Sequence, residues 1–306
     1  MNKPQDFIRA FLSQLGSLSE EERQWVFQCR RDFNRLGFCY QLIFVKVFNR
    51  LPQQEPLEII EDILSHASLQ IRIPVSKMNE YQKRRPTLSE HQMRLIKLLK
   101  LKRFETVDMF QIKEFIFQEA MRFEQSSLLF NRVQLFLKEH HILQPGESIL
   151  RRLISKQKKL SNQFIFSKIE GMISDKEREF LDALLIAPEN KVSPFHKLKE
   201  PPMGTSAKGL ISLTNKVELI LSTEFQKWDL SWLHTNYQRY MAKYALHCTA
   251  DRIRALQAGH RYTVMVCFLT QTYQETLDQI IDMFFKLMTR ITNQVQRELQ
   301  DRLHEK

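Results

Sequence analysis

The spacing of apolar residues constrains the fold of this chain more than any other feature of its sequence. In most windows, apolar side chains recur three and four positions apart, whereas alternation of apolar and polar residues is scarce. A period near 3.6 residues is typical of helices with one buried face, and a period of two is typical of strands. The sequence has 7 glycines and 10 prolines, fewer than the tight turns of a sheet-rich chain of 306 residues need. We therefore predict an all-α fold.

An excess of positive charge indicates a polyanionic partner. The formal net charge is +11. Such an excess favours binding to nucleic acid or to an anionic membrane, through counterion release and long-range attraction. The N-terminal segment has an acidic residue, Asp6, and lacks the apolar core of a signal peptide, and no stretch approaches about 18 uncharged apolar residues. We expect a cytoplasmic protein without a membrane partner.

The four cysteines predict reduced, buried thiols. They are widely spaced, lie in apolar or helical segments and include no C-x-x-C pair: Cys29, Cys39, Cys248 and Cys267. Free cysteine is among the residue types most often buried. Neither a disulfide framework nor a zinc site is expected from this pattern.

Breaks in the helical pattern divide the chain into several small helical modules and a linker. The predicted parts are an N-terminal helical module at 1–52, a helix-turn-helix-like module at 53–104, a third module with a long basic helix at 105–186, a proline-rich linker at 187–209, and a last module with a long terminal helix at 210–306. These boundaries are predicted from the clustered prolines and from the turn residues between apolar runs.

Individual helices are predicted from caps and apolar periodicity. Ser19 and Glu22 form a capping box, after which residues 34–51 are apolar on nearly all sides and predict a central core helix. Further helices are expected near 108–123, 126–140, 148–172 and 261–302. The last has an apolar seam of nearly three heptads, which suits packing on another long helix of the same or another chain.

The first dense basic tract lies in the helix-turn-helix-like module. Ten lysines and arginines and two glutamates lie between Ile71 and Phe104. A helix capped by Thr87 and Glu90 is expected behind Pro86, with Leu88, Leu95 and Leu99 facing inward and with Arg94 and Lys97 pointing away, beside Lys83, Arg84 and Arg85. In a helix-turn-helix unit such a helix meets base edges while nearby cations bind phosphates.

The second basic tract lies on the long helix near 148–172. Six basic residues and no acidic residue lie from Arg151 to Lys168. A helical projection places one set on a basic ridge, namely Arg152, Lys156, Lys159 and Gln163, and another on the core side, namely Leu150, Leu153, Ile154 and Phe164. An ordinary solvated face normally includes glutamate, so phosphate contact is favoured, although a solvated face stays an alternative.

Signals for catalysis are weak. The sequence has no Walker loop, dinucleotide fingerprint, H-E-x-x-H or G-x-S-x-G motif. His91 borders an apolar helix side, where a structural role is the more common one, and His140 and His141 lie at a helix end without ligands at metal spacing.

Several motifs, in order along nearly the whole chain, resemble those of Tn-three-family transposases. RRDFNRLGFCYQL at 30–42 resembles R-G-x-x-N-R-L-G-F-A-x-Q-L, and HHILQPGESILRRLI at 140–154 resembles R-I-V-L-P-G-x-S-T-L-E-R-L-V. Between them, a Y-x-x-R-x-x-T-x-x-x-H pattern is matched by Tyr81, Arg84, Thr87 and His91. LDALL at 181–185, the SPFHKLKEPP loop and the segment from His260 to Met288 resemble later landmarks.

The resemblance implies a helical region that binds the terminal inverted repeats of a replicative, cointegrate-forming transposon in the bacterial cytoplasm. The family's ribonuclease-H-like domain, whose two aspartates and glutamate bind magnesium, is expected beyond Lys306, so the chain is expected to be no enzyme by itself and to hold no cofactor. Motif positions carried over, as DNA contacts or as fold determinants, are Asn34, Arg35, Gly37, Gln41, Tyr81, Arg84 and His91.

The sequence departs from the family pattern in two places. Asp32-Phe33 stands where the family often has glycine and then an acidic or polar residue, which puts the local backbone geometry in doubt. Arg151 replaces the usual glutamate and adds positive charge.

The leading hypothesis is a truncated or N-terminal part of such a transposase that binds transposon-end DNA without cutting it. The candidate DNA-binding residues are Arg31, Asn34, Arg35, Lys83, Arg84, Arg85, Arg94, Lys97, Arg151, Arg152, Lys156 and Lys159. Alternatives are a helical interaction protein that forms a homodimer through its C-terminal helix, and a transposition repressor that competes for the ends.

Overall fold

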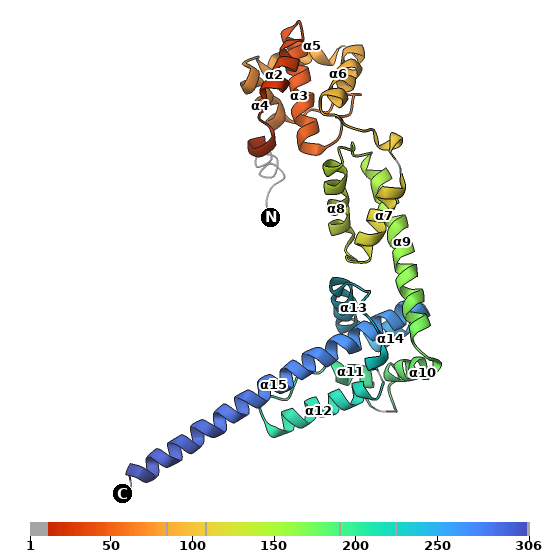
Figure 1. Ribbon diagram of the computed structural model, residues 1–306, viewed down its shortest axis with the longest axis vertical. Coiled ribbons are helices and arrows are strands. Elements are labelled where there is room, and N and C mark those ends of the chain that lie inside the picture. The colour runs from red at the N-terminus through yellow and green to blue at the C-terminus, as the bar shows by residue number, and fades with distance from the viewer. Residues whose placement is uncertain (1–11, 84, 108, 190, 224, 305–306) are drawn as a thin grey trace. The chain divides into compact units, whose positions relative to one another are not determined.

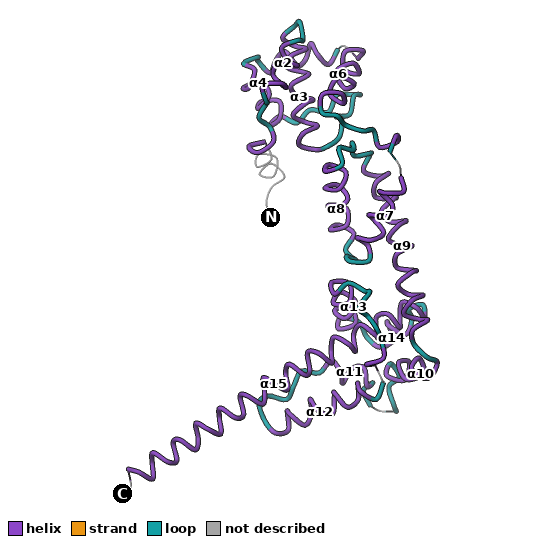
Figure 2. Tube along the Cα trace, viewed as in Figure 1, coloured by secondary structure: helices purple, strands orange, loops and turns teal. Residues whose placement is uncertain are grey.

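The computed structural model describes residues 12–304 except 84, 108, 190 and 224, with the backbone alone at Arg85, Arg302 and His304. Within these residues the regular structure is helical, and strand-like pairing is confined to two isolated bridges, Gln54 with Leu57 and Lys102 with Ile142 (Figure 2). The prediction of an all-α fold is confirmed. The chain forms two compact units, unit 1 (residues 1–114 and 130–154) and unit 2 (residues 115–129 and 155–306).

Unit 1 is built around one enclosed helix, α3 (Asp32–Phe48), as predicted. Every side chain from Leu36 to Val45 is buried, because a helix that is apolar all round must be covered on all sides. The covering elements are α2 (Glu20–Phe27), α4 (Glu61–Ile71), η1 (Val75–Lys77), α5 (Met78–Gln82) and α6 (Arg85–Leu98) (Figure 1). The capping box of Ser19 and Glu22 is confirmed at the start of α2.

The hydrophobic core of unit 1 continues across the module boundary predicted between residues 52 and 53. Leu88 and Leu95 of α6 are buried in the same cluster as the side chains of α3. The two predicted modules therefore share one core in this unit, and their behaviour as separate folding modules stays a prediction.

Helices in unit 1 end in the left-handed backbone conformation without glycine. The residues with positive φ are Asn49 after α3, Arg72 after α4, Lys100 near the end of α6 and His141 near the end of α8 (Ser126–Glu139). Asn49 tolerates this conformation and also uses its side chain, whose Nδ2 donates to the Ile142 carbonyl at 2.8 Å. The shortage of glycine is thus compensated by polar and charged residues at helix ends.

The start of α6 differs from the prediction. The capping box at Thr87 and Glu90 is wrong, because α6 begins at Arg85 and Thr87 lies inside its first turn. Proline fits this turn well, since its fixed φ suits a helix and the first N–H groups have no intrahelical partner. Pro86 therefore lies within the first turn rather than before it.

The middle of the chain follows the predicted helices closely. After η2 (Phe104–Thr106) come α7 (Met109–Ala120), α8, α9 (Glu147–Met172) and α10 (Asp175–Leu184). Helices α7, α8 and α9 each contribute residues to both units. The long basic helix is confirmed as α9.

Unit 2 is organised by α15 (Ala258–His304), which confirms the long terminal helix. Its N-terminal part is buried from Tyr262 to Leu269 and packs with α10, α12 (Ala207–Leu221), α13 (Thr235–His247) and α14 (Ala250–Arg254) (Figure 1). The unit also contains η3 (Phe225–Lys227). Neither α15 nor any other described helix combines the length and the apolar character needed to cross a membrane.

The proline-rich segment 187–209 contains a short helix, α11 (Pro194–Lys199). Ser193 caps it, and Phe195 and Leu198 are buried in the core of unit 2. Prolines in a first helical turn are compatible with a helix, so the proline content concealed this element.

Candidate nucleic-acid interface

Helix α9 carries an exposed basic ridge, which we define as Arg152, Lys156 and Lys159. All three side chains are exposed, and their spacing places them on one face of the helix. Among the described residues, none of the three forms an ion pair or a hydrogen bond with another side chain. The ridge therefore presents three unneutralised cations to solvent, which is the arrangement that binding of phosphates requires.

The other basic residues of α9 have partners within the protein. Arg151 pairs with Glu147 at 2.7 Å, and its guanidinium lies 4.6 Å from the centroid of the Phe130 ring. Lys158 pairs with Glu124 at 2.9 Å. Arg151 is thus partly neutralised, in contrast to the continuous acid-free tract that the sequence suggested.

The far end of the same helix carries an aromatic cluster. Phe164 is 45% exposed, so its predicted position on the core side is wrong. Its ring meets those of Phe117 and Trp232, and the Lys168 ammonium lies 4.0 Å from the centroid of the Trp232 ring. Helical projection cannot show this, because the rings that partner Phe164 come from other segments.

Only some of the DNA-binding residues predicted at and near α6 are exposed in the structure. Lys83 and Lys97 are exposed, as expected. Arg84 and the side chain of Arg85 lie outside the described residues. Lys83 caps the end of α5 and Lys97 lies on α6, and both positions are compatible with phosphate contact.

Arg94 does not point away from the core as predicted. Its guanidinium lies 5.5 Å from the Trp25 ring and 5.1 Å from the Phe38 ring, and it donates to Gln28 at 3.3 Å. Guanidinium groups stack well on aromatic faces, and α2 and α3 bring these rings to α6. Arg94 is therefore held within unit 1.

The three candidates at the start of α3 differ in exposure. Arg31 is exposed, whereas Asn34 and Arg35 are half-buried. Arg35 pairs with Asp32 at 3.1 Å and donates from Nε to the Cys29 carbonyl at 2.8 Å. The Asn34 Oδ1 atom is buried and has no hydrogen-bond partner within the described part of the chain. Arg31 is the most accessible of the three.

Four motif positions meet in the interior of unit 1. Gln41, Tyr81 and His91 are buried and joined in a chain, in which Gln41 Nε2 donates to the Tyr81 hydroxyl and that hydroxyl lies 2.8 Å from His91 Nδ1. Because the Tyr81 oxygen already accepts from Gln41, its proton is available for Nδ1. Gly37 lies directly against the Tyr81 ring. These positions support the fold and are not exposed to a ligand.

The environment of His91 keeps its imidazole neutral. Burial, followed by the positive charge of Arg94, lowers the pKa of His91 to about 4. Its Nε2 lies 3.8 Å from the Cys29 thiol, whose pKa is raised by burial. Sequence reasoning identified His91 as structural but missed its partners, because Cys29 lies far from it in sequence and no local pattern links the two.

Acid is expected to destabilise unit 1 through His91. The folded-state pKa lies below the ordinary value of 6.5, so the unfolded chain binds the proton more readily. The contribution of the neutral His91 to the free energy of unfolding is complete above about pH 6.5 and is lost as the pH falls toward 4. The loss between pH 7 and pH 5 is about 2 kcal/mol. Denaturant titration at several pH values measures this loss.

A matched pair of variants isolates the effect of His91. The His91→Gln variant is expected to lose this component of the pH dependence, whereas His140→Gln, which changes an exposed imidazole, is expected to retain it. An unchanged pH dependence in His91→Gln would contradict the assignment.

The described residues offer no cluster of three or more histidine, cysteine, aspartate or glutamate side chains that could hold a metal ion. All four cysteines are free and buried, as predicted.

Comparisons with known proteins give the family. The family described as a domain of unknown function (DUF4158) matches residues 3–157. The chain is 21% identical over 269 residues to the transposase for transposon Tn1546 of Enterococcus faecium, covering 87% of this chain and 27% of the relative.

Two further relatives agree in kind. The transposase for transposon Tn2501 of Escherichia coli is 20% identical, with 98% of this chain and 30% of the relative covered. The transposase for transposon gamma-delta of Escherichia coli (strain K12) is 22% identical, with 94% and 29% covered. The chain thus spans less than a third of the length of these relatives. It belongs to the DUF4158 family, and its relatives are Tn-three-family transposases.

Proposed function

We propose that this chain binds the terminal inverted-repeat DNA of a transposon, through the basic ridge on α9 and two exposed lysines, Lys83 at the end of α5 and Lys97 on α6. The observation that carries the proposal is the ridge of Arg152, Lys156 and Lys159, exposed and without acidic partners among the described residues. The similarity of the chain to transposases supports DNA of a transposon as the target. DNA is the polyanion that a transposase must hold, and cations in this state bind it by releasing counterions.

We further propose that the chain binds DNA without cutting it. The relatives are more than three times as long as the matched segment, which covers 27% to 30% of them. The described residues offer cationic side chains that can bind DNA, whereas cleavage of phosphodiesters needs positioned carboxylates and metal ions. Incubation with magnesium and end DNA, followed by a search for nicks, tests this part of the proposal.

A mobility-shift experiment tests the choice of target. A duplex with the end of the element is compared with a scrambled duplex of the same length and composition, at one stated salt concentration. We expect the end to bind at least about 1,000-fold more tightly, which is typical of specific recognition. Equal affinity for the two duplexes would overturn the proposal of end recognition and leave general DNA binding.

The C-terminal part of α15 supports a second proposal, that two copies of the chain form a homodimer. Large apolar side chains on one face are about half exposed, namely Ile281, Phe284, Met288, Ile291, Val295 and Leu299. Helices with such a seam pack against another helix to hide it. Within the described residues, no other element covers this face.

Charge on the apolar face of α15 is expected to separate the dimer. The double variant with Phe284→Asp and Met288→Asp loses two apolar contacts, each worth about 1.5–3 kcal/mol. The dissociation constant of the dimer should therefore rise by at least about 100-fold. Sedimentation equilibrium measures it. Asn293→Asp is the control, because residue 293 is exposed on the opposite side of the helix. A monomeric parent chain would contradict the proposal.

A further inference from the structure

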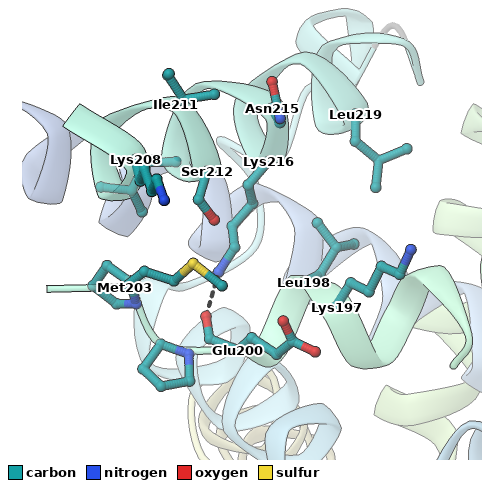
Figure 3. A pocket seen from close by; sticks show the side chains of 13 residues that line it. Lys197, Leu198, Glu200, Met203, Lys208, Ile211, Ser212, Asn215, Lys216 and Leu219 are labelled. Atoms are coloured by element: carbon teal, nitrogen blue, oxygen red, sulfur yellow. Dashed lines mark hydrogen bonds between the residues drawn. The ribbon is translucent and has the colours of Figure 1, made fainter. Parts of the chain in front are cut away.

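A pocket in unit 2 lies between α11 and α12, far in sequence from the basic ridge. We call it the α11–α12 pocket, and its volume is about 520 Å³. One wall is the face of α12 that carries Lys208, Ile211, Ser212, Asn215 and Lys216, and the other is formed by the end of α11 and the segment from Glu200 to Met203 (Figure 3). The pocket is open to solvent and is formed within one unit.

The lining combines apolar surface with an excess of positive charge. Met203 is 70% exposed and Ile211 is 59% exposed, while Leu198, which also lines the pocket, is buried. Three lysines line the pocket, and Glu200 is the one acidic residue among its lining residues. A ligand that fits this pocket must therefore offer both an anion and an apolar group.

Lys216 occupies the centre of the pocket. Its ammonium donates to the Glu200 carbonyl oxygen at 2.8 Å, as Figure 3 shows, and no carboxylate of the described chain lies within ion-pair distance of it. Burial lowers the pKa of Lys216, and the carboxylates of Glu200 and Glu275, which lie beyond ion-pair distance, offset only part of that shift. A half-buried cation whose one fixed acceptor is a neutral carbonyl has unused donors, and pairing with an anion would repay part of its desolvation.

We propose that the α11–α12 pocket binds an acidic peptide segment of a partner protein, with a carboxylate on Lys216 and a neighbouring apolar side chain against Ile211 and Met203. Charge complementarity to three lysines selects the acidic residues, and the exposed apolar rim selects their neighbours. A nucleic-acid backbone fits less well, because phosphates and sugars offer little apolar surface to cover Met203 and Ile211. This proposal does not depend on DNA binding by the ridge.

Fluorescence anisotropy with three short labelled peptides tests the pocket. The first peptide alternates aspartate with leucine and phenylalanine, the second has asparagine in place of each aspartate, and the third has serine in place of each apolar residue. The full chain, at about 0.15 M salt, is expected to bind the first at least about tenfold more tightly than the other two, since both halves of the recognition are needed.

Variants locate the binding. Lys216→Met keeps most of the side-chain stem and removes the charge. This variant is expected to bind the first peptide at least about tenfold more weakly, because it loses a charged hydrogen bond. Ile211→Ser changes an exposed side chain, so it tests the apolar contact without risk to the core. Lys243→Met, at an exposed lysine of α13, is the control.

The results separate the possibilities. Loss of binding in Lys216→Met and Ile211→Ser, with normal binding in Lys243→Met, supports the proposal. Equal binding of the first and third peptides, or unchanged binding in both pocket variants, would overturn it. So would displacement of the peptide by duplex DNA together with weaker DNA binding in Lys216→Met, because the pocket would then be a nucleic-acid site.

Discussion

Replacement of Gly37 by alanine is expected to destabilise unit 1 by at least about 3 kcal/mol. A Cβ atom at this position would lie 2.3 Å from the Cδ1 and Cε1 atoms of Tyr81. The Tyr81 ring cannot move aside, because it is fully buried and its hydroxyl is bound to Gln41 and His91. Overpacking in a rigid core costs about 1–3 kcal/mol, and the broken polar chain adds to that cost.

Fluorotryptophan NMR during denaturation measures the stability of unit 1 separately. Trp25 lies in unit 1, and the other two tryptophans, Trp228 and Trp232, lie in unit 2. The control is Gly171→Ala in α9, where an added Cβ meets nothing within 4 Å and alanine is the better helix former. A Gly37→Ala chain as stable as its parent would show that Tyr81 is free to shift.

Alanine at all three ridge positions, Arg152, Lys156 and Lys159, is expected to weaken DNA binding on the order of 100-fold near 0.15 M salt. If each side chain neutralises one phosphate, the slope of log K against log salt should become shallower by about 2.7. Helicity should not change, because the three side chains are exposed and alanine favours helices. Titrations of end DNA at several salt concentrations measure both quantities.

A second triple variant controls for net charge. Alanine at Lys176, Lys191 and Lys243 removes the same number of positive charges from exposed positions of unit 2. This variant should lose little affinity, with a slope close to that of the parent chain. Equal losses in the two triple variants would mean that total charge, and not the ridge, determines binding.

Much of the fold was predictable because strong local signals and tertiary packing agree. The core helix α3 is apolar on nearly all sides, α9 follows a proline and glycine break, and α15 has an apolar seam of nearly three heptads. The start of α6 and the whole of α11 were not predicted, since in both places proline lies inside a first helical turn, where it is compatible with a helix.

The ridge was predictable and the surroundings of Arg94 were not. Helical projection places Arg152, Lys156 and Lys159 together, because all three lie on the same face of one helix and no other segment is needed to bring them there. Arg94 is different, since its acceptor on Gln28 lies 66 positions away in sequence and the rings that hold it belong to α2 and α3. The pair of Arg151 with Glu147, four residues apart on one helix, was within reach of local spacing rules and was overlooked.

Crosslinking from the ridge to DNA tests the central claim most directly. The four native cysteines are buried, so a cysteine introduced at position 156 can be labelled selectively with a photoactivatable group. On irradiation with a transposon-end duplex, the label at 156 is expected to attach to DNA, and a label at position 243 is expected to give little product. Equal crosslinking from both positions, or none from 156 while the duplex is bound, would contradict the account.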